Sequence, residues 1–176
     1  MKVGIFSYSM TGNNKKLGEK LSSELGFDHI IIKEPEERKI GKIILDMLFG
    51  RKPKTNPSPK ELDNYDYIIM LSPIWMGKIA SPMRNYLKYM KNTDMKYSFF
   101  SISGGAMGSN PKIEKELKKR TGKYPDAQKD FQKVDLMSST KKPTSQETSD
   151  YQITEEDIDF VYNKIVEMLK NKNLIK

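Results

Sequence analysis

Short runs of apolar residues alternate along the chain with segments in which apolar positions recur at helical spacing. The runs predict five strands, at residues 3–6, 27–32, 67–71, 97–102 and 131–137. The helical segments lie at 17–25, 40–48, 83–90 and 113–121, and the last helix begins at 154. Parallel strands need a crossover connection, which is usually a helix. Strict alternation therefore predicts an α/β fold, a doubly wound parallel sheet with helices on both faces.

Two longer stretches interrupt this alternation. Residues 51–59 contain three prolines and are predicted to form a loop, as is the polar stretch 138–152, which is rich in Ser, Thr and Lys. Residues 36–60 and 138–152 are candidates for segments that cover one side of a binding site. We find no internal repeat and no domain boundary, so residues 1–176 are predicted to form one domain.

The amino-acid composition excludes several kinds of functional site. The chain has no cysteine, which excludes disulfides and cysteine-ligated zinc or iron–sulfur sites. Its one histidine, His29, excludes a two-histidine metal site and is expected at the surface or hydrogen-bonded, away from any site. The acidic run at 155–159 is explained as the first turns of a helix. We therefore expect no catalytic side chain and no metal, and any redox chemistry must come from a bound cofactor.

The charge balance is positive, with 31 Lys and Arg against 23 Asp and Glu, a formal net charge of +8. Only four of the cations are arginines, the residue best suited to base readout and to bidentate phosphate binding. Dispersed lysines are typical of a solvated surface, so we expect neither nucleic acid nor membrane as a partner. No targeting segment and no membrane-spanning run is evident, which predicts a cytoplasmic protein.

Candidate chemistry lies in the loops that follow the first, third and fourth strands, because open parallel sheets bind ligands at their carboxyl edge. The first loop, 7–14, offers hydroxyls, amides and Gly12 at a helix start but no P-loop lysine. It fits a single terminal phosphate held by neutral donors and the helix N-terminus, with Lys15 and Lys16 facing solvent. The alternative is that its polar side chains only cap the helix.

The other two loops offer flat and unobstructed surfaces. In the second, 72–78, the chain's one tryptophan, Trp75, is positioned to stack on a planar ring, and Gly77 allows close backbone approach. The alternative is that Trp75 packs as a plug across the strand ends. The third loop, 101–110, has three glycines whose backbone groups would meet a polar ring edge, or it is a plain glycine-rich turn.

Taken together, these loops resemble those of the flavodoxin-like FMN proteins. Residues 9–14 (Ser-Met-Thr-Gly-Asn-Asn) resemble the family's S-x-T-G-N-T phosphate loop, with an Asn in place of the last Thr; residues 73–77 and 103–105 resemble its two other flavin loops. The resemblance implies strand order 2-1-3-4-5 and noncovalently bound FMN. The residues it assigns to the cofactor are Ser9, Met10, Thr11, Gly12, Asn13, Asn14, Pro73, Ile74, Trp75, Met76, Gly77, Ser103, Gly104 and Gly105.

The resemblance favours an electron carrier that works through FMN. The alternative is an FMN-dependent NAD(P)H:quinone-type oxidoreductase, whose helix is similar to residues 83–87 here. A basic nucleic-acid- or membrane-binding module without flavin is the remaining, disfavoured alternative. Expected partners are a redox protein, or NAD(P)H or a quinone-like molecule, with the chain a monomer or homodimer. Lys78 and Arg84 are expected near the flavin end, where they would attract an anionic cofactor or an acidic redox partner.

Overall fold

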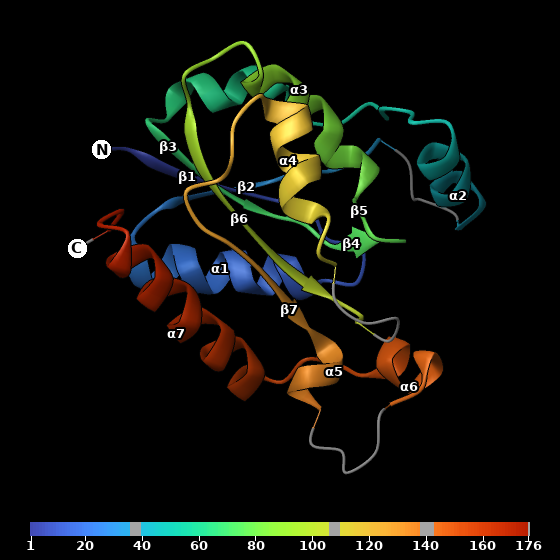
Figure 1. Ribbon diagram of the computed structural model, residues 1–176. Helices are drawn as coiled ribbons and strands as arrows, with labels where there is room; N and C mark the ends of the chain where they lie inside the picture. The colour runs from blue at the N-terminus through green and yellow to red at the C-terminus, as the bar shows by residue number, and fades with distance from the viewer. Residues whose placement is uncertain (36–39, 106–109, 138–142, 176) are drawn as a thin grey trace.

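Five parallel strands form the centre of the fold in the order β2-β1-β3-β6-β7 (Figure 1). The computed structural model describes residues 1–35, 40–105, 110–137 and 143–175. The strands are β1 (Val3–Ser7), β2 (Asp28–Ile31), β3 (Tyr67–Leu71), β6 (Lys96–Ser103) and β7 (Gln128–Gln132), all paired in parallel. This order confirms the predicted 2-1-3-4-5 topology. The strand order reverses between β1 and β3, the point at which a doubly wound fold binds its ligand.

Two helical layers cover the sheet. Helices α1 (Asn13–Leu25) and α7 (Glu155–Asn171) lie on one face, and α3 (Arg84–Met90), α4 (Ile113–Thr121) and the 3-10 turn η1 (Pro59–Asn64) lie on the other (Figure 1). The alternation of side chains along β6 separates the two cores, since Phe99 packs on the α3–α4 side and Phe100 on the α1–α7 side. Each helix thus buries one apolar stripe, as the spacing predicts.

Smaller elements surround the carboxyl edge. Helix α2 (Ile40–Leu48) projects beyond the sheet at the right of Figure 1. A short antiparallel hairpin of β4 (Ile74–Trp75) and β5 (Lys78–Ile79) follows β3 and leads through η2 (Ser81–Met83) into α3. Two short helices, α5 (Lys133–Leu136) and α6 (Ser145–Asp150), follow β7. No helix among the described residues is both long and apolar enough to span a bilayer.

Three sequence predictions were wrong in detail. The fifth strand is 128–132 rather than 131–137, because an edge strand needs no continuous apolar run and β7 is held by its register with β6. The stretch 138–152 is not a loop throughout, since a capping box of Thr144 and Glu147 starts α6; residues 138–142 lie outside the described residues. The loop after β3 contains the β4–β5 hairpin.

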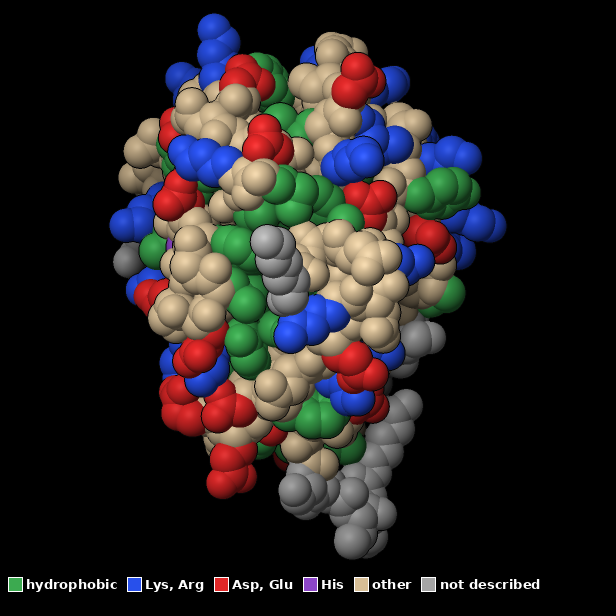
Figure 2. All heavy atoms as spheres, turned by 90° about the vertical axis from the view of Figure 1, so that its left-hand side faces the viewer, with side chains coloured by type: hydrophobic (Ala, Val, Ile, Leu, Met, Phe, Trp, Pro, Cys, Tyr) green, Lys and Arg blue, Asp and Glu red, His purple; other side chains and the backbone are tan. Residues whose placement is uncertain are grey.

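The surface around the chain termini carries mixed charge. Figure 2 views this side of the molecule, and acidic and basic side chains are interspersed over it. Ion pairs at the amino edge and along α1 and α7, such as Lys2–Asp28 and Lys20–Asp159, account for part of this mixture. Exposed pairs of this kind add little stability, but they balance the local charge.

Candidate functional site

The three predicted loops meet at the carboxyl edge of the sheet, around a cavity of about 150 Å³. Nine of the fourteen predicted cofactor residues line it: Met10, Thr11, Asn13, Asn14, Pro73, Ile74, Trp75, Ser103 and Gly104. The other five do not. Ser9 and Gly12 belong to the same first loop, Met76 and Gly77 form the hairpin turn, and Gly105 approaches Gln132. The structure therefore brings together segments that are about 60 and 30 residues apart in sequence.

The start of α1 has no side-chain cap from any described residue. Gly12 occupies the N-cap position with φ 90° and ψ −21°, a left-handed conformation that favours glycine, and no hydrogen bond from a cap side chain is found there within the described part of the chain. The buried Oγ of Ser9 has no hydrogen-bond partner among the described residues. The capping alternative requires a hydroxyl or amide oxygen bonded to these amides, and that bond is absent here. The loop therefore holds hydrogen-bonding capacity at the positive end of a helix.

Asn14 has a structural task within this loop. Its side-chain amide donates to the carbonyl of Ile102 (3.0 Å) and accepts from the Ile102 amide (2.9 Å), and the residue is 2% exposed. The pair ties the start of α1 to the end of β6, beyond Phe100, where the pairing of β6 with β3 ends. These two bonds use one of the two N–H donors and one of the two acceptor sites of the side chain.

Trp75 lies between the cavity and the hydrophobic core. Its ring is half-buried, lines the cavity and packs edge-to-face on Tyr8, with the ring centroids 5.8 Å apart at 82°. Tyr8 is itself held by a hydrogen bond from its hydroxyl to Glu34 (2.9 Å). The packing on Tyr8 fits the interpretation of Trp75 as a plug, and it also fixes an aromatic wall at the cavity; stacking on a ligand ring stays a prediction.

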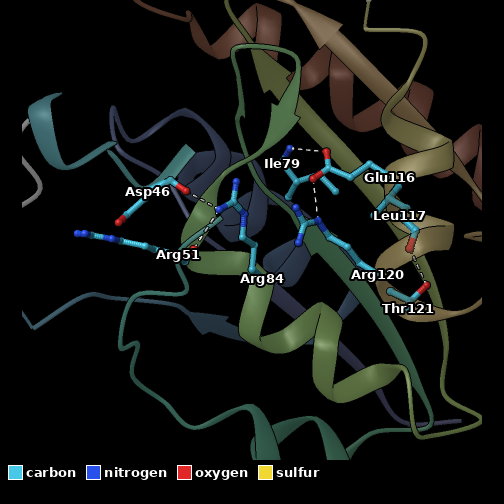
Figure 3. Close-up of polar contacts among 8 residues, drawn as sticks. All are labelled: Asp46, Arg51, Ile79, Arg84, Glu116, Leu117, Arg120 and Thr121. Atoms are coloured by element: carbon cyan, nitrogen blue, oxygen red, sulfur yellow. Dashed lines mark hydrogen bonds and ion pairs between the residues drawn. The ribbon is translucent and has the colours of Figure 1, made fainter. Parts of the chain in front are cut away.

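The hairpin turn beside Trp75 is tightly held. Met76 and Gly77 both have positive φ, 49° and 71°, as a two-residue hairpin turn requires, and a methionine is strained there. Glu116 of α4 anchors β5, the strand that follows the turn, because its carboxylate accepts from the Ile79 amide (3.0 Å) and from Arg120 Nε (2.7 Å) (Figure 3). The turn and α4 are thus locked together.

Arg84 is buried, and the expectation that it attracts an anionic partner is wrong. The residue is 1% exposed, and its guanidinium donates to the carbonyls of Asp46 (2.7 Å) and Arg51 (3.0 Å) (Figure 3). It therefore ties α3 to the end of α2. Lys78, by contrast, is exposed on β5, as expected.

Lys133 and Thr148 line the cavity but were not predicted. Lys133 begins α5 in a stretch predicted as strand, and Thr148 lies on α6 in a stretch predicted as loop. Lys133 is buried; burial lowers its pKa, and the charge of Asp150 opposes that shift. No local pattern distinguishes either residue. The segment 138–152 does reach the site, through Thr148, whereas Gly50 and Lys52 line a different groove.

The remaining minor predictions fit the structure. His29 is hydrogen-bonded to Ser7, with 2.7 Å between Oγ and Nε2, and burial lowers its pKa. Lys15 and Lys16 are exposed and form ion pairs with Glu19 and Glu155. Neither the histidine nor the two lysines line the cavity.

Comparison with known proteins places the fold. No protein-family model and no curated protein matches the chain. Among solved structures, a flavoprotein in complex with FMN from Lactobacillus acidophilus is 28% identical, with a TM-score of 0.61 over 78% of this chain and 99% of that one. Flavodoxin 1 from Bacillus cereus is 15% identical, with a TM-score of 0.53 over 97% and 98%. A WrbA-like flavodoxin from Agrobacterium tumefaciens is 14% identical, with a TM-score of 0.51 over 99% of both chains.

At such low identities the two flavodoxin matches speak for the fold alone. They extend over almost the whole chain, and the strand order agrees with the topology expected from the three loops. Together, the five-stranded order and these matches show that the chain has a flavodoxin-like fold.

Proposed function

We propose that the chain binds FMN noncovalently at the carboxyl edge of the sheet and carries electrons through it. The observation that carries this proposal is the uncapped start of α1 beside the buried, unpartnered Ser9 Oγ. A buried hydroxyl without a partner costs free energy, which a bound phosphate oxygen would recover. The flavoprotein from Lactobacillus acidophilus, solved in complex with FMN, supports the choice of ligand.

The phosphate would be held by neutral donors. The first-turn amides of α1 and the hydroxyls of Ser9 and Thr11 supply hydrogen bonds, and the helix N-terminus supplies positive potential. Lys15 and Lys16 are engaged with carboxylates on the outside of the helix. Among the described residues, the one lysine that lines the cavity is Lys133, whose lowered pKa reflects its burial.

The flavin ring would lie against Trp75, with the backbone of Ser103 and Gly104 on another side of the cavity. FMN supplies the redox chemistry when bound, and the chain's residues bind it, orient it and exclude water from part of it. The cavity of about 150 Å³ is smaller than the ~300–1,000 Å³ typical of small-molecule sites. A ring held there keeps an exposed edge and leaves little room for a second substrate. Electron exchange with a partner at that edge is the function this arrangement favours.

Titration of the flavin-free protein with FMN tests the binding step. We expect quenching of flavin fluorescence and a saturable complex. Ser9→Ala should weaken binding by about 5- to 100-fold, which corresponds to ~1–3 kcal/mol for a buried hydrogen bond to a charged group. Ser23→Ala is the matched control, since its hydroxyl bonds to the Lys20 carbonyl on the outside of the same helix. Equal affinity of the parent and Ser9→Ala proteins would remove the phosphate assignment.

Rapid mixing of the FMN-loaded protein with NADH or NADPH tests the carrier role. We expect slow direct reduction, as for a protein that exchanges electrons with a partner rather than with a nucleotide. Fast bleaching by either nucleotide would instead assign the chain to the NAD(P)H:quinone-type oxidoreductases. A redox titration that resolves two one-electron steps would support the carrier.

A further inference from the structure

A second hollow, separate from the cofactor cavity, lies between the end of α2, the β4–β5 hairpin, α3 and α4. Its volume is about 720 Å³. Seven lysines line it, among them Lys52 after α2, Lys78 on β5, Lys88 on α3, and Lys115 and Lys119 on α4. Its only carboxylate among the described residues is Glu116, which is already bound to Arg120 and the Ile79 amide. We call this hollow the lysine groove.

The positive charge in the groove is not balanced within the described chain. None of the seven lysines forms an ion pair with a described residue. Burial and the charges of Lys88, Arg120 and Arg84 lower the pKa of Lys52, so the cations weaken one another's charged state. By contrast, the side seen in Figure 2 mixes both signs. Cations held together without a counter-charge favour an anionic occupant.

An exposed apolar stripe borders the groove. Ile44, Leu45 and Leu48 of α2 and Phe49 just after it form two adjacent pairs one helical turn apart, and all four are exposed; Leu48 and Phe49 reach 67% and 69%. Leu48 also lines the groove, so the two features are continuous. Large apolar side chains gathered on one helix face mark an interaction surface more often than chance exposure does. We call the stripe and the groove together the α2–groove surface.

We propose that the α2–groove surface is the docking site for an acidic partner protein, whose carboxylates enter the groove while apolar residues cover Leu48 and Phe49. The inference does not depend on the flavin. The surface lies next to the cofactor cavity, because Gly77 lines the groove and Trp75 of the same hairpin lines the cavity. A partner docked there would lie close to that cavity.

Other occupants fit the surface less well. Nucleic acid is read and clamped best by arginine, and the two arginines of the groove are engaged, Arg84 with backbone carbonyls and Arg120 with Glu116. A flat bilayer would not reach lysines that line a hollow. None of the described residues that line the groove is aromatic and able to stack on a nucleotide base. A second copy of this surface would bring like charges together.

The experiment measures binding of a fluorescein-labelled peptide that carries glutamates on one helical face and leucines on the other. It is run on the full chain with and without FMN. We expect saturable binding that weakens as salt rises, since exposed charges are screened. The groove variant K88Q/K115Q/K119Q should lose about tenfold in affinity, given ~0.2–1 kcal/mol per exposed ion pair. Leu48→Ser should also weaken binding several-fold.

The matched control is K164Q/K170Q/K172Q, which removes the same charge from α7 and the residue after its end, on the opposite layer of the fold. It should bind the peptide as the parent does. Equal loss in both triple variants would reduce the effect to net charge and overturn the proposal, as would no salt-sensitive binding at all.

Competing occupants are tested with the same variants. Tighter binding of duplex DNA or of phosphatidylglycerol vesicles than of the peptide, lost in the groove variant alone, would overturn the proposal in favour of that ligand. So would concentration-dependent self-association that the groove variant abolishes. Circular dichroism of each variant checks that the fold is retained.

Discussion

Replacement of Asn14 tests how the cofactor loop is held to the sheet. Asn14→Ala removes two buried hydrogen bonds, to the amide and the carbonyl of Ile102, and leaves both backbone groups unpaired. An unpaired buried polar group costs ~1–3 kcal/mol. The expected loss in the free energy of unfolding is therefore about 2–5 kcal/mol, a large part of the ~5–15 kcal/mol that stabilises a domain.

Two further substitutions at Asn14 separate the roles of its amide donor and its carbonyl acceptor. Asn14→Asp keeps the acceptor for the Ile102 amide but, when ionised, turns a second oxygen toward the Ile102 carbonyl; it should be destabilised at neutral pH and partly rescued on protonation. Asn14→Thr, the residue of the resembling loop, should fall between the parent and Asn14→Ala. Urea unfolding at constant slope measures all three. A loss below about 1 kcal/mol for Asn14→Ala, equal to that of the exposed control Asn163→Ala, would refute the assigned role.

Two other predictions concern buried polar groups. Burial lowers the pKa of His29 below its usual 6.5, so the unfolded chain binds more protons near pH 6. The histidine therefore stabilises the fold fully above that pH, and the stability is lost as pH falls toward the folded-state pKa; urea unfolding of His29→Gln between pH 5 and 8 should show a weaker pH dependence. Arg84→Met removes the guanidinium's hydrogen bonds to the Asp46 and Arg51 carbonyls, of which the Asp46 carbonyl still accepts from the Arg51 amide, and should cost about 1–3 kcal/mol. Hydrogen exchange should then rise at the end of α2, and an unchanged rate there would contradict the anchoring role.

Local pattern was sufficient for the elements that bury a regular apolar face. The apolar run at 67–71 is β3, the leucines of 17–25 lie on α1, and the capping residues at 154–157 start α7. The composition of loop 9–14 also pointed to its place at the sheet edge, and most of its residues line the cavity. Each of these features depends on neighbours close in sequence, which is why periodicity and turn chemistry could predict it.

Tertiary structure decided what depends on distant segments. The polar strand β7 forms because β6 supplies its hydrogen-bond ladder. Arg84 is buried because backbone carbonyls at the end of α2 and just after it accept hydrogen bonds from its guanidinium. Lys133 and Thr148 reach the cavity because the fold brings their segments to it. Lysines between positions 52 and 119 likewise share one groove because the crossovers bring their segments together. The sequence by itself determined the alternating elements and the chemistry of the loops. Which side chains meet was decided by packing, since contacts across tens of residues leave no local periodicity to read.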